Sequence, residues 1–206
     1  MLFSGRGSNM AALLRAAAVD GFPGRFVLAL SNVAAAPGMA VAEEFGMPAR
    51  CVAHREFGRD REAHERAVQA ALVEAGVELV CLAGYMRLLT PFLVEAWAGR
   101  MLNIHPSLLP SFAGLDTHRR ALAAGVKLHG CTVHLVTQAV DSGPILAQAV
   151  VPVLTDDDEE RLAARVLVQE HVLYPTALRL FLERRAGQAD AGASLHNPLP
   201  MAAGSQ

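Results

Sequence analysis

The sequence predicts an α/β fold in which an open, mostly parallel and twisted sheet is flanked by helices. Three apolar runs, at residues 26–30, 78–83 and 101–104, are continuous rather than alternating, as is typical of parallel strands covered on both faces. Helical patterns separate these runs, and such an alternation implies right-handed crossovers. Because ligands of these sheets bind at the carboxyl ends of the strands, we expect the chemistry there.

A short strand, a glycine-rich turn and a helix are expected at the N-terminus, at residues 1–3, 4–9 and 10–18. A central strand usually has about five or six residues, so a chain that begins further upstream would explain the brevity of this one. The helix continues directly from the turn, which puts its amino end next to the carboxyl end of the first strand.

The clearest helix covers residues 60–75 and ends at Gly76, a residue type that is common after the last turn of a helix. Its apolar side is expected to consist of Ala63, Ala67, Ala70, Ala71 and Val73. Its opposite, solvent side is expected to carry most of Arg61, Glu62, Glu65 and Arg66.

Two further strands and a long helix are expected in the second half of the chain. Residues 130–137 and 145–153 flank a loop and would extend the later half of the sheet. The helix is expected at residues 156–185, with Thr155 as its N-cap. An acidic first turn complements the positive end of this helix.

Size and composition indicate one soluble, cytoplasmic domain at residues 1–185, followed by a flexible tail at 186–206 that is rich in Ala, Gly, Ser and Pro. The formal net charge is −2 without a strongly basic stretch, which argues against a nucleic-acid partner. No apolar run approaches the roughly 20 residues that span a bilayer. Cys51, Cys81 and Cys131 are too far apart for a C-x-x-C metal pair or a disulfide framework. We therefore expect small-molecule substrates, no membrane and no metal, and the sequence leaves a monomer and a homodimer equally open.

The turn at residues 4–9, Ser-Gly-Arg-Gly-Ser-Asn, is a candidate anion site. Glycines let main-chain N–H groups approach an anion closely, and the amino end of the following helix adds free donors and a favourable dipole. Gly7, Ser8 and Asn9 are therefore candidate phosphate-binding residues. The alternative is a tight turn in which Ser8 caps the helix, and the sequence does not choose between the two. Met10 replaces the last glycine of a dinucleotide fingerprint, which favours a monophosphate.

The segment 101–110 ends a predicted central strand with Asn103, His105 and Pro106. Alternation along a strand places Asn103 and His105 on the same face, and the proline keeps His105 extended. An amide N–H and an imidazole aimed at one point can stabilise a developing oxyanion and move a proton. A lone strand histidine is usually structural, but the companion asparagine and the position at the strand end favour a catalytic role.

Asp141 lies in the loop 138–144, whose small residues allow the backbone to bend sharply. A carboxylate brought close to His105 would favour the charged imidazolium. The alternative is ordinary turn chemistry, because Asp-Ser-Gly is a common turn sequence. Asp141 is the third candidate catalytic residue.

Five short motifs give the chain a resemblance to a known family. They are Ser-Gly-Arg-Gly-Ser-Asn at 4–9, Ala-Gly-Tyr-Met-Arg-Leu-Leu at 83–89, Asn-Ile-His-Pro-Ser-Leu-Leu-Pro at 103–110, Asp-Ser-Gly-Pro at 141–144 and Gln-Glu-His at 169–171. In this order and spacing they resemble the folate-dependent glycinamide ribonucleotide formyltransferases. The resemblance implies a Rossmann-like formyltransferase fold.

The resemblance also implies roles for individual residues. Gly7, Ser8 and Asn9 would bind the ribose 5-phosphate, and Glu170 would contact the sugar or glycinamide part of the substrate. The residues that would bind the folate are Arg61, Met86, Arg87, Leu88, Leu89, Asn103 and Asp141. Main-chain amides of the stretch at 86–89 would contact the pterin, with aliphatic side chains beside it. Without the resemblance, Arg61 and Glu170 would be interpreted as exposed helix charges, and Met86, Leu88 and Leu89 as core residues.

The reaction implied is direct transfer of the formyl group of 10-formyltetrahydrofolate to the amine of glycinamide ribonucleotide, in purine biosynthesis. Asn103 and protonated His105 would stabilise an oxyanion intermediate. Asp141 would keep His105 protonated and organise a water that carries the amine proton. No metal and no nucleophilic side chain are expected.

Three alternatives share parts of this site. A formyltetrahydrofolate hydrolase has the same core, but it usually has an extra N-terminal domain and no need of the phosphate turn. A methionyl-tRNA formyltransferase would carry a second, basic domain. A catalytically silent nucleotide-binding module would not need Asn103, His105 and Asp141 together.

Overall fold

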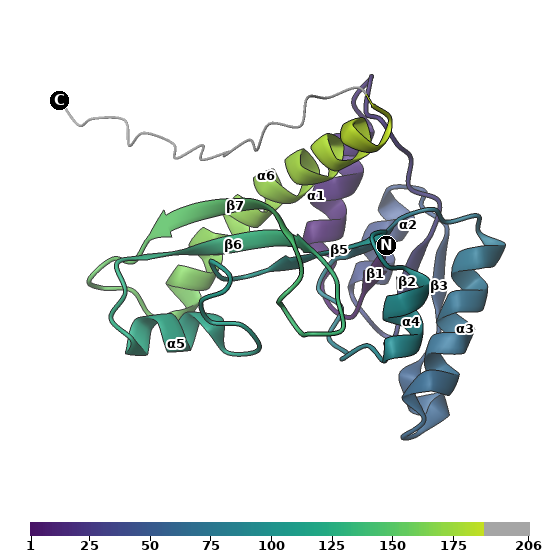
Figure 1. Ribbon diagram of the computed structural model, residues 1–206, viewed down its shortest axis with the longest axis horizontal. Helices are drawn as coiled ribbons and strands as arrows, with labels where there is room; N and C mark the ends of the chain where they lie inside the picture. The colour runs from purple at the N-terminus through teal and green to yellow at the C-terminus, as the bar shows by residue number, and fades with distance from the viewer. Residues whose placement is uncertain (188–206) are drawn as a thin grey trace.

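Residues 1–187 are the part of the chain that the computed structural model describes, and the predicted tail lies outside it from residue 188 onward. A seven-stranded sheet has the strand order β3-β2-β1-β4-β5-β6-β7. Its strands are β1 (Leu2–Phe3), β2 (Ala29–Ser31), β3 (Ala49–Cys51), β4 (Val80–Leu82), β5 (Met101–His105), β6 (Leu128–Leu135) and β7 (Ile145–Pro152). Strands β1 to β5 are parallel, whereas β6 and β7 run antiparallel to their neighbours, so the predicted open, mostly parallel sheet is confirmed (Figure 1).

Helices of very different length connect the strands. They are α1 (Ser8–Ala17), α2 (Gly38–Glu44), the 3-10 helix η1 (His54–Phe57), α3 (Arg61–Glu74), α4 (Pro91–Ala96), α5 (Thr117–Ala123) and α6 (Glu159–Arg185). None of the helices in the described part of the chain is both long and apolar enough to cross a membrane.

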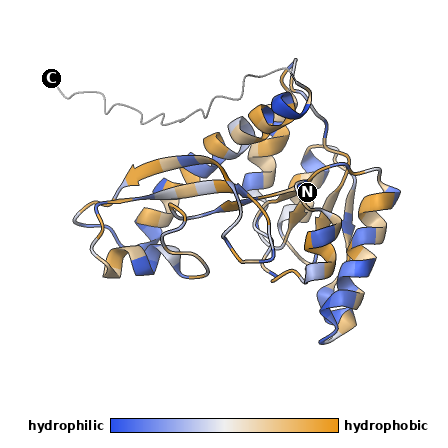
Figure 2. Cartoon of the chain, in the orientation of Figure 1, coloured by the Kyte–Doolittle hydropathy of each residue, from blue (hydrophilic) through white to orange (hydrophobic). Residues whose placement is uncertain are grey.

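Helices cover both faces of the sheet, which explains why the strands are apolar in continuous runs. Phe3 and Leu102 pack on the face that α1, α2 and α6 cover. Their chain neighbours, Leu2 and Met101, pack on the opposite face, under α3 and α4. In Figure 2 the strands are mainly orange, whereas α3 carries many blue residues, in keeping with a helix that has one face in solvent.

The strand order brings β1 next to β4, although β2 and β3 follow β1 along the chain. The direction of the crossovers therefore changes between β1 and β4, and open sheets of this type bind ligands at that point. The turn after β1 and the segment after β4 both start there, and β5 ends beside them. The predicted phosphate turn and the predicted catalytic strand end thus share one edge of the sheet.

The strand predicted at residues 26–30 is shorter and later in the structure. β2 begins at Ala29, where its pairing with Ala49 of β3 starts, and Leu30 pairs with Leu2 of β1. β3 does not appear among the predicted strands, since it is short and largely exposed and therefore lacks an apolar run.

The strand predicted at residues 130–137 also has different limits. In the structure β6 covers Leu128–Leu135. The bond from the N–H of Val136 to the carbonyl of Met101, at 2.8 Å, closes its pairing with β5, since β5 begins at Met101. Beyond that point the chain leaves the sheet and forms the loop that carries Asp141.

The buried side of α3 differs from the prediction. It consists of His64, Glu65, Val68, Ala71 and Leu72, whereas Ala70 and Val73 are exposed. The sequence pattern places Glu65 toward solvent, but its carboxylate accepts hydrogen bonds from the hydroxyl and, at 2.8 Å, from the main-chain N–H of Thr90. A carboxylate paired in this way can be buried at a lower cost than a free one.

α6 begins at Glu159, three residues later than the predicted start at residue 156. Asp158 is the N-cap and accepts the N–H of Arg161 at 2.8 Å, so the predicted Thr155 cap is wrong. Asp157 pairs with Arg165 at 2.6 Å and accepts the N–H of Leu154 at 2.8 Å, which fixes the turn before the helix. The acidic cluster therefore has a structural role.

Candidate active site

The carboxyl end of β5 presents Asn103 and His105 on one face, as predicted from their spacing. The antiparallel neighbour β6 places His134 opposite Asn103 and Thr132 opposite His105. The two strands together therefore form a polar patch on a sheet that is otherwise apolar.

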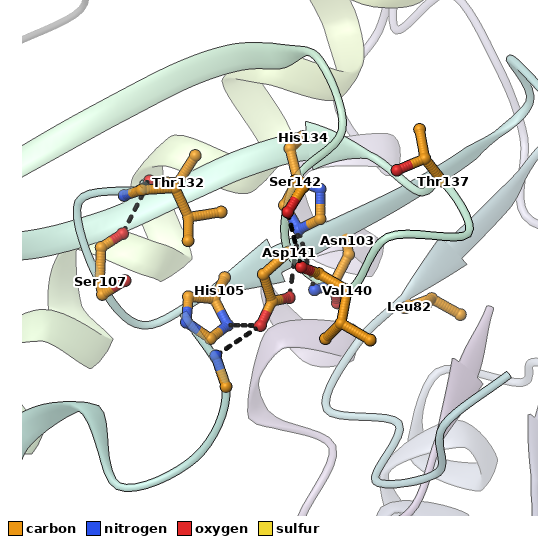
Figure 3. Close-up of polar contacts among 12 residues, drawn as sticks. Leu82, Asn103, His105, Ser107, Thr132, His134, Thr137, Val140, Asp141 and Ser142 are labelled. Carbon is orange, nitrogen blue, oxygen red and sulfur yellow. Dashed lines mark hydrogen bonds and ion pairs between the residues drawn. The ribbon is translucent and has the colours of Figure 1, made fainter. Parts of the chain in front are cut away.

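His105 is held between two hydrogen-bond acceptors, of which Figure 3 shows Asp141. Its Nδ1 lies 3.3 Å from Oδ2 of Asp141, and its Nε2 lies 3.2 Å from the carbonyl oxygen of Phe112. Carboxylate and carbonyl oxygens accept only, so an imidazole that carries a proton on both nitrogens satisfies both partners. The contact between Asp141 and His105 that the sequence analysis expects is therefore present.

Asp141 reaches His105 because its loop folds back over β5. Its backbone has φ of 50°, in the left-handed region that non-glycine residues rarely adopt and that aspartate tolerates better than most. Oδ2 also accepts the N–H of Gly114 at 2.8 Å, which ties the loop to the segment after His105. The side chains of His105 and Asp141 are only 8% and 11% exposed, so solvent screens their interaction weakly.

His134 completes this cluster and is absent from the predicted site. Its Nδ1 lies 2.9 Å from the carbonyl oxygen of Leu135, so Nδ1 carries the proton and Nε2 is left with a lone pair. The amide nitrogen of Asn103 lies 3.2 Å from Nε2 and can donate to it. Burial lowers the pKa of His134, which favours this neutral form. One signal in the sequence is the alternation of Thr132 and His134 within the apolar run of β6.

The glycine turn after β1 leaves the amino end of α1 uncapped. Gly7 is the N-cap, with φ of 77°, and no side chain among residues 1–187 accepts a bond from the first turn. Ser8 is the first helical residue, so the alternative in which Ser8 caps the helix is wrong. A Cβ on Gly7 would lie 2.9 Å from Cα of Gly38, so the turn depends on glycine. Free amides and a helix dipole at one point suit an anion.

Asn9 and Glu170 meet beside this turn, although they come from α1 and α6. The amide nitrogen of Asn9 donates to Oε2 of Glu170 at 2.7 Å. Burial raises the pKa of Glu170, and the bond from Asn9 partly opposes this rise. Oδ1 of Asn9 is buried without a partner among the described residues. It can therefore accept a hydrogen bond from a ligand.

The segment after β4 exposes aliphatic side chains at the same edge of the sheet. Met86 is 69% exposed and Leu88 is 57% exposed. The hydroxyl of Ser4 accepts the main-chain N–H of Met86 at 2.8 Å. The amide of Met86 is therefore not free for a ligand. The amides of Arg87, Leu88 and Leu89 have no hydrogen-bond partner in the described part of the chain.

Arg61 is the predicted site residue that the structure does not join to the others. It is the first residue of α3 and is exposed. Among residues 1–187, no group of three or more His, Cys, Asp or Glu side chains is arranged to hold a metal ion.

The chain matches the family model described as formyl transferase over residues 1–178. It therefore belongs to the formyl transferase family, which fits a site built from an amide, an imidazole and a carboxylate around one point.

Comparison with individual proteins narrows this class. The chain is 41% identical to the phosphoribosylglycinamide formyltransferase of Escherichia coli, over 90% of this chain and 87% of that protein. It superposes on a crystal structure of phosphoribosylglycinamide formyltransferase from Brucella melitensis with a TM-score of 0.84 and 53% identity, covering 94% of this chain and 95% of that chain. Within the family, the chain thus belongs with the phosphoribosylglycinamide formyltransferases.

A longer relative shares the same region. The chain is 43% identical to part of the trifunctional purine biosynthetic protein adenosine-3 of Gallus gallus, over 93% of this chain and 19% of that protein. The chain therefore spans about a fifth of the length of this trifunctional relative.

Proposed function

We propose that the chain transfers the formyl group of 10-formyltetrahydrofolate to the amine of phosphoribosylglycinamide, also called glycinamide ribonucleotide, in purine biosynthesis. The observation that carries this proposal is the cluster of Asn103, His105 and Asp141 on the same sheet edge as the uncapped turn at Gly7. The cluster would act on the formyl carbon and the turn would bind the phosphate, so one elongated substrate would contact both.

The phosphate end of the acceptor is assigned to the turn after β1. Gly7, Ser8 and Asn9 supply main-chain donors at the amino end of α1, where the helix dipole favours an anion. Glu170 and the unpaired Oδ1 of Asn9 lie beside this turn and offer acceptors to hydroxyl or N–H groups of the substrate. Glu170 is buried beside the turn, as expected for a carboxylate that contacts a bound substrate away from solvent.

The formyl donor is assigned to the segment after β4. Its unpaired amides, at Arg87, Leu88 and Leu89, match the hydrogen-bonding edge of a pterin, and Met86 and Leu88 offer exposed aliphatic surface. The folate supplies the formyl carbon and accepts a proton as it leaves. We assign the guanidinium groups of Arg61 and Arg87 to the negatively charged end of the folate, because both are cationic and lie on segments that border this edge.

Three side chains act on the reacting atoms. Asn103 donates an N–H to the oxygen that becomes negative when the amine attacks the formyl carbon. The imidazolium of His105 donates its Nε2–H to the same oxygen, which takes the place of the Phe112 carbonyl. Removal of one such donor costs on the order of 3 kcal/mol in other enzymes, so these two groups can supply much of the rate. Asp141 favours the imidazolium form and holds a water that takes the amine proton. The attacking group is the amine of the substrate, so the route needs neither a nucleophilic side chain nor a metal.

His134 orients one of these groups. Its neutral Nε2 accepts one N–H of the Asn103 amide, and this bond fixes the orientation of the amide, with its nitrogen toward His134. The second N–H of the amide is then left for the formyl oxygen.

The compartment and the assembly are further parts of the proposal. Cys51, Cys81 and Cys131 are all unpaired, which suits a reducing compartment such as the cytoplasm. The reaction needs small molecules only, and it can take place in a monomer or in a homodimer.

The test is an assay of formyl transfer from 10-formyltetrahydrofolate in the presence and absence of phosphoribosylglycinamide. Formation of tetrahydrofolate that depends strictly on the ribonucleotide supports the proposal. Release of formate at the same rate without the ribonucleotide would identify a hydrolase instead. Absence of both reactions in a protein that still binds the two ligands would favour a silent binding module.

A further inference from the structure

Ser4 opens the glycine turn, yet its side chain is directed toward the segment after β4. Its Oγ donates to Oδ1 of Asn32 at 2.6 Å and accepts the main-chain N–H of Met86 at 2.8 Å. A hydroxyl has one proton, and Asn32 takes it. Ser4 therefore has no donor left for a phosphate, despite its position in the predicted phosphate motif.

Asn32 holds the hydroxyl in this orientation. It follows the end of β2 and is only 2% exposed. Its main-chain carbonyl accepts the N–H of His54 at 3.1 Å, and its side-chain nitrogen lies 3.3 Å from Nδ1 of His54, which leaves Oδ1 directed toward Ser4. Because the proton of the Ser4 hydroxyl is directed to Asn32, which follows β2, the lone pairs of Oγ are left to accept the N–H of Met86.

The segment at residues 85–89 is supported by the packing of Tyr85 and Leu89 against the core and by the bond to Met86. β4 and the bond from Ser4 N–H to the carbonyl of Gly84, at 3.0 Å, hold the start of this segment. Thr90, which is bonded to Glu65, holds its end. Between these two points, the N–H of Met86 is the only main-chain group with a hydrogen bond in the described part of the chain.

We infer that Ser4 is a positioning residue for the formyl-donor subsite rather than a ligand of the phosphate. Its hydroxyl fixes the path of residues 85–89 and so presents the amides of Arg87 to Leu89 in one arrangement. This inference rests on the proposed function, which assigns those amides to the pterin. Loss of the hydroxyl should release the segment and weaken the binding of folate, while the turn at Gly7 keeps its shape.

The experiment measures two dissociation constants by calorimetry, for tetrahydrofolate under reducing conditions and for phosphoribosylglycinamide. A hydrogen bond of ordinary net strength corresponds to about three- to tenfold in an equilibrium constant, so Ser4→Ala should weaken tetrahydrofolate binding by about that factor. Its affinity for the ribonucleotide should match that of the wild type, which also shows that the variant is folded. Ser4→Thr, which keeps the hydroxyl, should recover most of the folate affinity.

Ser8→Ala is the matched control, since it removes the other hydroxyl of the same turn. The hydroxyl of Ser8 has no hydrogen-bond partner among residues 1–187 and can donate to the phosphate beside the main-chain donors. Ser8→Ala should therefore weaken binding of the ribonucleotide and leave tetrahydrofolate binding unchanged, the reverse of Ser4→Ala. Equal folate affinity in wild type and Ser4→Ala would overturn the inference, as would a loss confined to the ribonucleotide or shared by both ligands. If the wild type itself binds no tetrahydrofolate, the proposed function fails before the role of Ser4 is reached.

Discussion

Oδ2 of Asp141 contacts both Nδ1 of His105, at 3.3 Å, and the N–H of Gly114, at 2.8 Å. One carboxylate oxygen therefore joins the imidazole to the segment that follows it in the chain. We expect Asp141→Asn to lower kcat by about 10²- to 10⁴-fold, because an amide does not favour imidazolium. The KM values should change much less, since the charged histidine matters most when the oxyanion forms.

Single-turnover measurements of formyl transfer check this expectation without interference from product release. Ser142→Ala is a suitable control, because the hydroxyl of Ser142 bonds only within its own loop, to the carbonyl of Val140 at 2.9 Å. A near-normal single-turnover rate in Asp141→Asn would remove the carboxylate from the chemistry and leave it as a loop residue.

His134 offers a second test, because it touches Asn103 at 3.2 Å and has no proposed contact with substrate. His134→Leu removes the acceptor for the Asn103 amide and should lower kcat about tenfold, the value of one hydrogen bond of about 1.4 kcal/mol. KM for both substrates should stay close to that of the wild type. His134→Gln can offer a carbonyl oxygen to the same amide and should recover part of the rate. A Gln variant as slow as the Leu variant would argue against the orienting role.

Gly7 is expected to tolerate no side chain. Its φ of 77° costs an alanine about 1 kcal/mol, and the Cβ would also lie 2.9 Å from Cα of Gly38. Gly76 is the matched control, because its φ is 63° and nothing lies within 4 Å of a Cβ there. Urea unfolding should show a larger loss of stability for Gly7→Ala than for Gly76→Ala, by roughly 1–3 kcal/mol. Equal losses would mean that the turn can move away from Gly38.

Glu170→Gln should separate stability from binding. Burial raises the pKa of Glu170, so this carboxyl favours the folded state in acid, and that contribution is lost as the pH rises through its folded pKa. At neutral pH, replacement by a neutral amide should therefore raise Tm, by about 2–4 °C for each kcal/mol gained. Affinity for the ribonucleotide should fall. Thermal scans at pH 4 and pH 7 test the sign, and a gain in Tm that is larger in acid would contradict it.

Acid sensitivity should come from a buried histidine. Burial first, and then the neighbouring His118, lower the pKa of His129 to about 4. In the unfolded chain, His129 has an ordinary histidine pKa of about 6.5. Its contribution to the free energy of unfolding is therefore fully present above pH 6.5 and is lost as the pH falls toward 4, because the unfolded chain binds the proton first. His129→Gln should flatten the dependence of unfolding free energy on pH in this window. An unchanged slope would assign the acid sensitivity to other groups.

The sequence predicts the fold and part of the site for identifiable physical reasons. Continuous apolar strands and intervening helices are local patterns, and they lead to the sheet that the structure shows. Asn103 and His105 are recognisable because their shared face depends only on the spacing along one strand. The approach of Asp141 to His105 depends on the path of a whole loop, so the sequence raises it only as a hypothesis.

Other features lie beyond local patterns. The contact between His134 and Asn103 requires the antiparallel register of β5 and β6, which no spacing within one strand reveals. The local pattern predicts Glu65 on the surface, because its hydrogen-bond partner, Thr90, lies 25 residues further along the chain. The bond from the N–H of Met86 to Oγ of Ser4 joins the ends of two strands that are adjacent only because of the strand order.

The strand order also places the proposed binding site of the acceptor and the proposed catalytic residues on different strands. The turn assigned to the acceptor begins at β1 and closes against α2 and α6, whereas Asn103, His105 and Asp141 belong to β5 and to the loop after β6. The turn and these three residues share a sheet edge, but no hydrogen bond or ion pair joins them among residues 1–187, so either can change while the other keeps its shape. A different amine could thus be accommodated by exchanging the segment between β1 and α1 together with the partner of Asn9 on α6. The same formyl chemistry would then serve a new acceptor, which makes this chain a suitable starting point for redirecting one-carbon transfer.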